Sequence, residues 1–118
     1  MCMNKKTIIS VAVITYNQQD TIRQTLDSIL TQKGDFDLEI VIGEDCSTDN
    51  TRAICEEYAR VNELENERVR ETIVRDELRK KIEGKRLMKL LPNTKNLGIM
   101  ANFARVMQAC TGDYVGIC

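Results

Sequence analysis

Two adjacent carboxylates, Glu44 and Asp45, stand directly after an apolar run that ends in a glycine (residues 38–43). An apolar run of this length, between turn and helix-cap signals, is typical of a buried parallel strand that leads into a helix. Open α/β sheets bind their ligands at the carboxyl ends of such strands. The two carboxylates are therefore candidate acceptors for hydrogen bonds from a ring N–H or a ribose hydroxyl.

A second polar group, Thr15, Tyr16 and Asn17, follows the nearly continuous apolar run at residues 8–14. Tyr16 offers a flat face on which a nucleobase can stack, a contact worth about 1–3 kcal/mol. Thr15 and Asn17, together with backbone N–H groups at the start of the next helix, can orient a ribose or a phosphate. This group predicts a nucleotide site beside the carboxylates.

A third group lies at the start of the helix expected after residue 98, where the helix dipole favours an anion. Its members are Asn96, Gly98 and Asn102. No G-x-G-x-x-G follows a strand and no G-x-x-x-x-G-K-[ST] occurs, which argues against a dinucleotide dehydrogenase or a P-loop enzyme.

Each candidate also has a structural interpretation. Tyr16 can simply cover the edge of the sheet, and residues 96–98 are typical of a turn. Ser47, Thr48 and Asp49 are residue types that favour helix N-caps over ligand binding. Glu44 and Asp45 are the hardest to explain structurally, although a capping carboxylate is again the alternative.

The elements that must position these residues alternate along the chain. Strands are predicted at residues 8–14, 38–42, 87–91 and 114–118 from their apolar, β-branched runs. Helices are predicted from their apolar spacing. The first begins near a cap at Asp20 and stops at Gly34, with Ile22, Leu26, Ile29 and Leu30 facing the sheet. The others start near residues 47–51, burying Ile54, Cys55 and Tyr58, and at Gly98, burying Ile99, Phe103, Val106, Met107 and Cys110.

This β-α alternation predicts a mostly parallel sheet with helices on both faces. With strands numbered in chain order, the order 3-2-1-4 brings the loops after strands one, two and four together. Residues 62–86 are rich in Glu, Arg and Lys. Their spacing indicates a solvated extension of the second helix that projects beyond the sheet and ends at Gly84.

Composition limits the function further. The chain has 118 residues, enough for one domain, and an aromatic content of 4% predicts a mainly aliphatic core. A net charge of −1 argues against nucleic acid as a partner. The absence of histidine removes every Ser-His or Cys-His catalytic arrangement and leaves the five scattered cysteines without the usual zinc co-ligands. With no signal-peptide pattern, we expect a cytoplasmic location, with the inner face of the membrane as a second option.

With these residues in view, the chain resembles the family 2 glycosyltransferases, which have the GT-A fold. The resemblance rests on residues 10–17 with 22–32, residues 39–51, the Asn-Leu-Gly at 96–98 and residues 111–115, four blocks in the family's order and spacing. The resemblance implies a Rossmann-like GT-A half domain over residues 1–118, with the charged helix at about 62–86 as an insertion.

The family's site residues map by position onto Thr15, Tyr16, Asn17, Glu44, Asp45 and Asn102. The resemblance places Tyr16 against the base and Asp45 on a ring nitrogen of a nucleotide-diphospho sugar. Glu44 stands where the family usually has an aspartate. Asn102 stands near a position that helps to hold the donor, where many members have a small residue.

The family's metal-binding Asp-x-Asp, which would hold Mg²⁺ or Mn²⁺, and its catalytic base come after the strand at 114–118. We therefore expect this chain to be a donor-binding fragment that holds no metal and is inactive alone. The full-length family member would transfer a sugar to a glycan or lipid-linked acceptor in surface polysaccharide synthesis.

The alternative is a non-catalytic α/β module that forms homo-oligomers through the exposed sheet edge or the charged helix. A receiver-like phosphorelay domain also gathers carboxylates at strand ends, but it needs an acidic pair after the first strand, which this sequence lacks.

Overall fold

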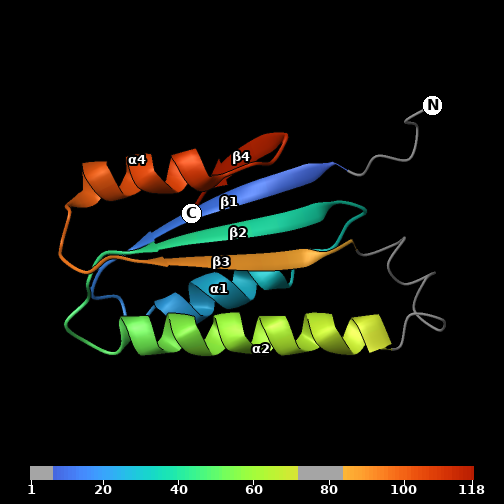
Figure 1. Cartoon of the computed structure of the whole chain (residues 1–118), viewed down its shortest axis with the longest axis horizontal. Coiled ribbons are helices and arrows are strands. Elements are labelled where there is room, and N and C mark those ends of the chain that lie inside the picture. The colour runs from blue at the N-terminus through green and yellow to red at the C-terminus, as the bar shows by residue number, and fades with distance from the viewer. Residues whose placement is uncertain (1–6, 72–83) are drawn as a thin grey trace.

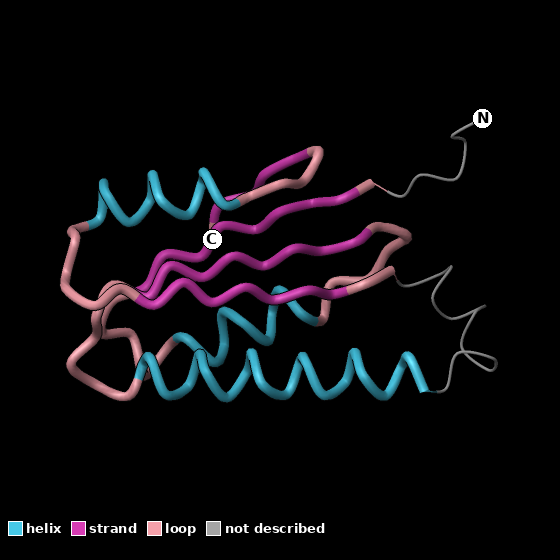
Figure 2. The backbone as a smooth tube through the Cα atoms, viewed as in Figure 1, coloured by secondary structure: helices cyan, strands magenta, loops and turns pink. Residues whose placement is uncertain are grey.

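Helices and strands alternate along the chain in a computed structural model that describes residues 7–71 and 84–118, with side chains for 7–65 and 84–118 (Figures 1 and 2). The elements are β1 (Ile8–Thr15), α1 (Ile22–Leu30), β2 (Asp37–Glu44), α2 (Thr51–Glu71), β3 (Arg86–Pro92), α4 (Ile99–Ala109) and β4 (Tyr114–Ile117). Every strand lies within two residues of its predicted position. None of the helices in the described ranges is long and apolar enough to cross a membrane.

The four strands form one parallel sheet in the order β3-β2-β1-β4, as predicted from the sequence. β1 and β2 pair along their whole length, so that Thr15 lies beside Glu44 at their carboxyl ends. β3 continues the sheet beside β2, with Pro92 next to Glu44. The carboxyl ends of these three strands therefore meet at one edge, at the left of Figure 1.

Helices cover both faces of the sheet: α1 and α2 lie on one face and α4 lies on the other (Figure 1). The core between the sheet and α1 and α2 is the larger, and none of its buried side chains among the described residues is aromatic. Its fully buried members include Ile22, Leu26, Ile40 and Ile42. The smaller core under α4 consists of Ala12, Val41 and Val106.

Gly43 allows α4 to approach the sheet closely. A Cβ atom at this position would lie 2.4 Å from Cγ2 of Val106 and 2.6 Å from Oδ1 of Asn102. Both distances are far below van der Waals contact, so any larger residue would push α4 away. The glycine before the two carboxylates therefore sets the distance between α4 and β2.

Three details of the helices differ from the sequence predictions. The N-cap of α1 is Thr21, not Asp20, and it makes no side-chain capping hydrogen bond. The same helix ends at Leu30, before Gly34. In α4 the buried residues are Asn102 and Val106, whereas Ile99 is 74% exposed, because Asn102 is the residue that lies against Gly43.

The second helix continues past Asn62 to Glu71, as the sequence predicted. Residues 72–83, the rest of the charged segment, lie outside the described residues. The expected end of this helix near Gly84 therefore stays a prediction.

Candidate functional site at the carboxyl edge of the sheet

The loops that follow β1 and β2 are joined by hydrogen bonds. The Asp45 N–H donates to the Thr15 carbonyl oxygen at 3.0 Å. Asn17 adopts a left-handed backbone conformation (φ 51°), in which its N–H donates to Oγ of Ser47 at 2.9 Å. Its side-chain Oδ1 accepts a hydrogen bond from the N–H of Thr48 at 2.8 Å. Asn17 therefore fixes the two loops relative to each other.

Side chains satisfy the backbone N–H groups at the start of α2. Asp49 accepts from the Thr51 N–H at 2.9 Å, and Gln19 accepts from the Asn50 N–H at 3.0 Å. Burial alone would raise the pKa of Asp49, but hydrogen bonds from Thr51 and Gln19 lower it. Asp49 is thus a helix-capping residue, as the structural interpretation of the sequence proposed.

Glu44 is fully buried and both of its carboxylate oxygens have partners. Oε1 accepts from the Ser47 N–H at 2.8 Å, and Oε2 accepts from Nε of Arg52 at 2.7 Å. The hydrogen bond to Glu44 raises the pKa of Arg52. Arg52 also donates to the backbone carbonyl oxygen of Asn93, so the Glu44–Arg52 ion pair connects the ends of β2 and β3 with the start of α2.

Asp45, which is 3% exposed, holds the loop between β3 and α4. Its Oδ1 accepts from the Leu97 N–H at 2.7 Å and from Nδ2 of Asn93 at 2.9 Å, and its Oδ2 accepts from the Gly98 N–H at 3.0 Å. Burial alone would raise the pKa of Asp45, but these three hydrogen bonds lower it. The carboxylate is therefore ionised at neutral pH.

The six residues singled out in the sequence all lie at this edge. Thr15 is buried and donates to Oε1 of Gln18 at 2.8 Å. Asn102 is buried and donates from Nδ2 to the Gly43 carbonyl oxygen at 2.9 Å. Tyr16, in contrast, is 44% exposed. The edge thus combines an accessible aromatic ring with buried polar groups that hold its loops in place.

Two residues of this edge were not foreseen as functional. They are Asn93 and Arg52, neither of which was singled out from the sequence. Both join loops that are distant in sequence: Asn93 contacts Asp45 and Asn102, and Arg52 contacts Glu44 and Asn93. The loop after β3 therefore belongs to the same edge as the loops after β1 and β2. A polar residue immediately after the only proline of the chain was the available signal.

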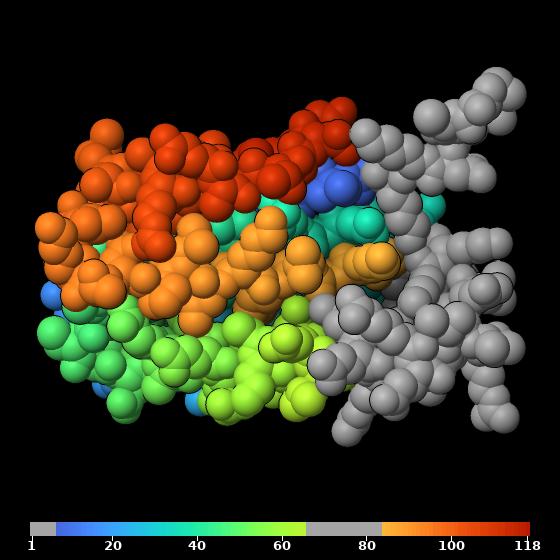
Figure 3. All heavy atoms as spheres, viewed as in Figure 1, coloured from blue at the N-terminus to red at the C-terminus, as the bar shows by residue number. Residues whose placement is uncertain are grey.

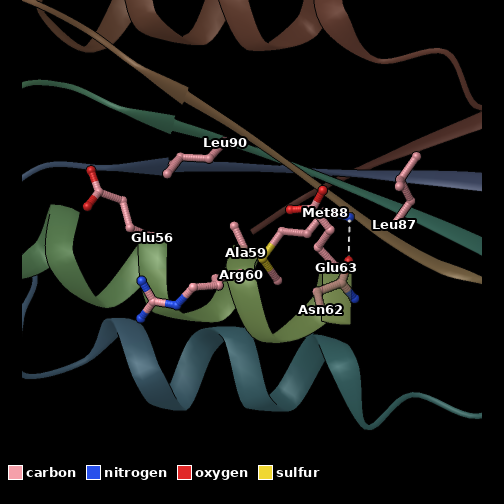
Figure 4. Close-up of a pocket in the computed structure, with 8 residues that line it drawn as sticks. All are labelled: Glu56, Ala59, Arg60, Asn62, Glu63, Leu87, Met88 and Leu90. Carbon is pink, nitrogen blue, oxygen red and sulfur yellow. Dashed lines mark hydrogen bonds between the residues drawn. The ribbon is translucent and has the colours of Figure 1, made fainter. Parts of the chain in front are cut away.

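Two grooves lie elsewhere on the molecule. One, of about 450 Å³, runs between α2 and β3 and is lined by residues that include Ala59, Leu87 and Leu90 (Figure 4). Figure 3 shows the face of the molecule on which β3 and α2 lie side by side. The other, of about 430 Å³, lies between α1 and α2 and is lined in part by Arg23 and Tyr58. Neither groove contains any of the six candidate residues.

Within residues 7–65 and 84–118, whose side chains the structure describes, no three His, Cys, Asp or Glu side chains lie together in a way that could hold a metal ion. Each oxygen of the Glu44 and Asp45 carboxylates already accepts at least one hydrogen bond from the protein. The described residues therefore do not fit the divalent metal that the family resemblance implies.

The parallel sheet in the order 3-2-1-4, with polar loops at its carboxyl edge, superposes on a solved glycosyltransferase structure, and the chain therefore has the GT-A fold. A solved structure with this fold is the mannosyltransferase PcManGT from Pyrobaculum calidifontis, in complex with GDP-Man and Mn²⁺. It superposes with a TM-score of 0.63 at 23% sequence identity, over 95% of this chain and 27% of that chain.

The chain belongs to glycosyl transferase family 2, whose sequence profile matches residues 10–118. It is 32% identical over 111 residues to the uncharacterized protein Rv1520 of Mycobacterium tuberculosis. The aligned region covers 93% of this chain and 25% of Rv1520. It is 40% identical over 60 residues to the putative teichuronic acid biosynthesis glycosyltransferase TuaG of Bacillus subtilis, over 51% of this chain and 23% of TuaG. The chain thus spans about a quarter of the length of these relatives.

Proposed function

We propose that this chain is the donor-binding part of a glycosyltransferase that uses a nucleotide-diphospho sugar. Family membership supports the enzyme class, and the bound GDP-Man of the structurally similar mannosyltransferase supports this type of donor. The transfer would be a displacement at the anomeric carbon of the sugar by an acceptor hydroxyl. The role proposed for the described residues is limited to holding the nucleotide.

The observation that carries the proposal is the exposed ring of Tyr16 at an edge whose loops are held by hydrogen bonds to the side chains of Asn17 and Asp45. A rigid edge with one accessible aromatic face suits a nucleobase, because stacking needs a preformed flat surface. Asp45 is the proposed acceptor for a ring N–H of the base. A carboxylate has about four acceptor positions, and three of them are used by the protein.

The remaining candidates act on the shape of the site. Thr15 and Asn17 set the loop that carries Tyr16, and Glu44 and Asn102 set the loop that carries Asp45. The relative TuaG is described as acting in teichuronic acid biosynthesis. We accordingly propose a glycan or lipid-linked acceptor in surface polysaccharide synthesis for the protein in which this domain works. Mg²⁺ or Mn²⁺ is the proposed cofactor of that protein, since the metal would stabilise the leaving diphosphate.

Calorimetric titration of the chain with UDP-, GDP- and dTDP-sugars tests donor binding. Binding of one of them is expected, and replacing Tyr16 by Ala should weaken it by about 1–3 kcal/mol. Tyr114→Ala is the matched control, because Tyr114 is also an exposed tyrosine (68%) but lies at the start of β4. No heat with any of the three donors at millimolar concentration, or equal effects of the two substitutions, would contradict the proposal.

One observation favours a second candidate, a non-catalytic module that forms oligomers. The edge strand β4 exposes Tyr114, Val115 and Ile117, and unpaired strand edges with apolar side chains associate readily. Light scattering at increasing protein concentration tests this candidate. A mass that rises to that of a dimer would support it, and a monomer at every concentration would exclude it.

A further inference from the structure

Two buried asparagines connect three elements at the carboxyl edge. Asn102 of α4 donates from Nδ2 to the Gly43 carbonyl oxygen at 2.9 Å. Its Oδ1 accepts from Nδ2 of Asn93 at 3.1 Å, and the same Nδ2 donates to Oδ1 of Asp45 at 2.9 Å. Asn93 is 3% exposed and Asn102 is fully buried.

Chemistry fixes the orientation of both amide groups. The Gly43 carbonyl oxygen can only accept, so Asn102 must turn its nitrogen toward it and its oxygen toward Asn93. Asn93 then faces two acceptors, the oxygen of Asn102 and the carboxylate of Asp45, and must present its nitrogen to both. A flipped Asn93 amide would bring oxygen against oxygen on both sides.

The forced orientation leaves the oxygen of Asn93 without a partner. Among the side chains that the structure describes, Asn93 Oδ1 is the one buried polar atom with no hydrogen bond. Burying an unpaired acceptor costs free energy. Few other residues could take its place at the same size, because serine has one hydrogen to donate, aspartate has none when ionised, and glutamine is one methylene longer. An asparagine at this position therefore costs stability through its unpaired oxygen, but it can donate hydrogen bonds to two acceptors at once.

We propose that Asn93 is a positioning residue of the donor site, which orients the Asp45 carboxylate and, through it, the backbone of Leu97 and Gly98. This inference rests on the proposed function. Asp45 accepts from the N–H groups of Leu97 and Gly98, so its orientation determines where the loop before α4 lies. Asn93 is itself held from the backbone, because its N–H donates to the Glu44 carbonyl oxygen at 2.9 Å and its own carbonyl oxygen accepts from Arg52.

Replacement of Asn93 by Leu, which removes both donated hydrogen bonds, is the principal test. Asn93→Ser, which keeps one hydroxyl donor in a smaller side chain, is the milder variant in case the first folds poorly. Asn62→Leu is the matched control. Asn62 is also a buried asparagine, and it donates to the Arg86 carbonyl oxygen at 3.0 Å and accepts from the Met88 N–H at 3.2 Å, in the groove of Figure 4.

Two measurements are made on each variant: amide hydrogen exchange at Leu97 and Gly98, and the Kd of the nucleotide sugar that wild type binds best. Asn93→Leu is expected to speed exchange at both amides about tenfold and to raise Kd about tenfold, with Asn93→Ser intermediate. The control is expected to lower the thermal midpoint and leave both readouts unchanged, which separates positioning from general stability.

Unchanged exchange at Leu97 and Gly98 in folded Asn93→Leu would overturn the proposal, as would a Kd within twofold of wild type. If wild type binds none of the nucleotide sugars, the proposed function fails, and hydrogen exchange alone then decides whether Asn93 holds this loop.

Discussion

Two buried carboxylates, Glu39 within β2 and Asp45 directly after it, differ in how their charges are stabilised. Glu39, near the amino end, is 5% exposed and pairs with Lys89, whose Nζ lies 2.8 Å from Oε2. Asp45, directly after the carboxyl end, is 3% exposed and is held by neutral N–H donors in the described part of the chain.

The partners of Glu39 join several strands. Ser10 of β1 donates its hydroxyl at 2.9 Å, and Thr111, before β4, donates its N–H at 2.8 Å and its hydroxyl at 2.7 Å. Burial alone would raise the pKa of Glu39, but the hydrogen bonds from Lys89, Thr111 and Ser10 outweigh it and lower the pKa to about 2. Glu39 therefore acts as a structural connection between β1, β2, β3 and the turn before β4.

The comparison teaches that burial and hydrogen bonding alone do not identify a ligand-binding carboxylate. Glu39 is paired with a cation and lies near the amino end of β2. Asp45 lies at the carboxyl edge, where its N–H donates to the carbonyl oxygen of Thr15, the residue before the accessible Tyr16. Position in the sheet, together with the absence of a cation among the described partners of Asp45, separates the two roles. Substitutions at each end of β2 can test this separation.

The largest effect is expected for Glu39→Gln. The change removes the charge that pairs with Lys89 and leaves one of the Thr111 or Ser10 donors without an acceptor, so the free energy of unfolding should fall by about 2–4 kcal/mol. Urea denaturation measures it. Glu57→Gln is the control, because Glu57 pairs with Arg23 on the surface and should leave the unfolding midpoint unchanged. Equal midpoints for both variants would show that the Glu39 connection is not stabilising.

Acid should remove the same contribution in wild type. The folded-state pKa of Glu39, about 2, lies below the ordinary value of 4.5, so the stabilisation is complete above pH 4.5 and is lost as the pH falls toward 2. The difference in unfolding free energy between wild type and Glu39→Gln should therefore shrink over this range. A difference that stays constant from pH 6 to about pH 2.5 would be inconsistent with an ionised, hydrogen-bonded Glu39.

Much of the fold could be predicted from the sequence because apolar, β-branched runs and helix spacing are local signals. The parallel sheet order and the GT-A fold are confirmed. Glu39 was read as part of an apolar strand, because its partners Ser10, Lys89 and Thr111 come from distant segments and only the strand register brings them together.

At the candidate site, too, partners that come from distant segments of the chain were not predicted from the sequence. That Tyr16 and Asp45 lie at the same edge of the sheet follows from their place after neighbouring strands, so it could be predicted. The use of Asn93 as a double donor depends on the distance between α4 and β2, which Gly43 sets, and no local pattern encodes that distance. The roles of the six candidate residues in binding remain predictions.

A smaller loss of stability is expected for Gly43→Ala. The added methyl group would overlap Val106 and Asn102, and such overpacking costs about 1–3 kcal/mol. Because the overlap displaces Asn102, nucleotide affinity should fall as well, whereas Glu39→Gln should leave affinity within twofold of wild type. Chemical denaturation and calorimetry measure the two effects. Loss of stability with unchanged affinity would mean that the carboxyl edge does not depend on the packing of α4.

The smallest loss of stability is expected for Asp45→Asn, about 1 kcal/mol, because this substitution leaves no cation unpaired. The amide oxygen of the new asparagine can still accept from the Leu97 N–H. Its amide nitrogen replaces Oδ2 and therefore faces the Gly98 N–H, from which it cannot accept. Nucleotide affinity should nevertheless fall about tenfold, since both the proposed acceptor for the base and the position of the loop are altered. The two substitutions are thus expected to differ in their main effect. Glu39→Gln mainly lowers stability and leaves nucleotide affinity nearly unchanged, whereas Asp45→Asn mainly lowers nucleotide affinity. If Asp45→Asn costs as much stability as Glu39→Gln and leaves the Kd unchanged, Asp45 has the same structural role as Glu39, and the nucleotide site must be sought away from β2.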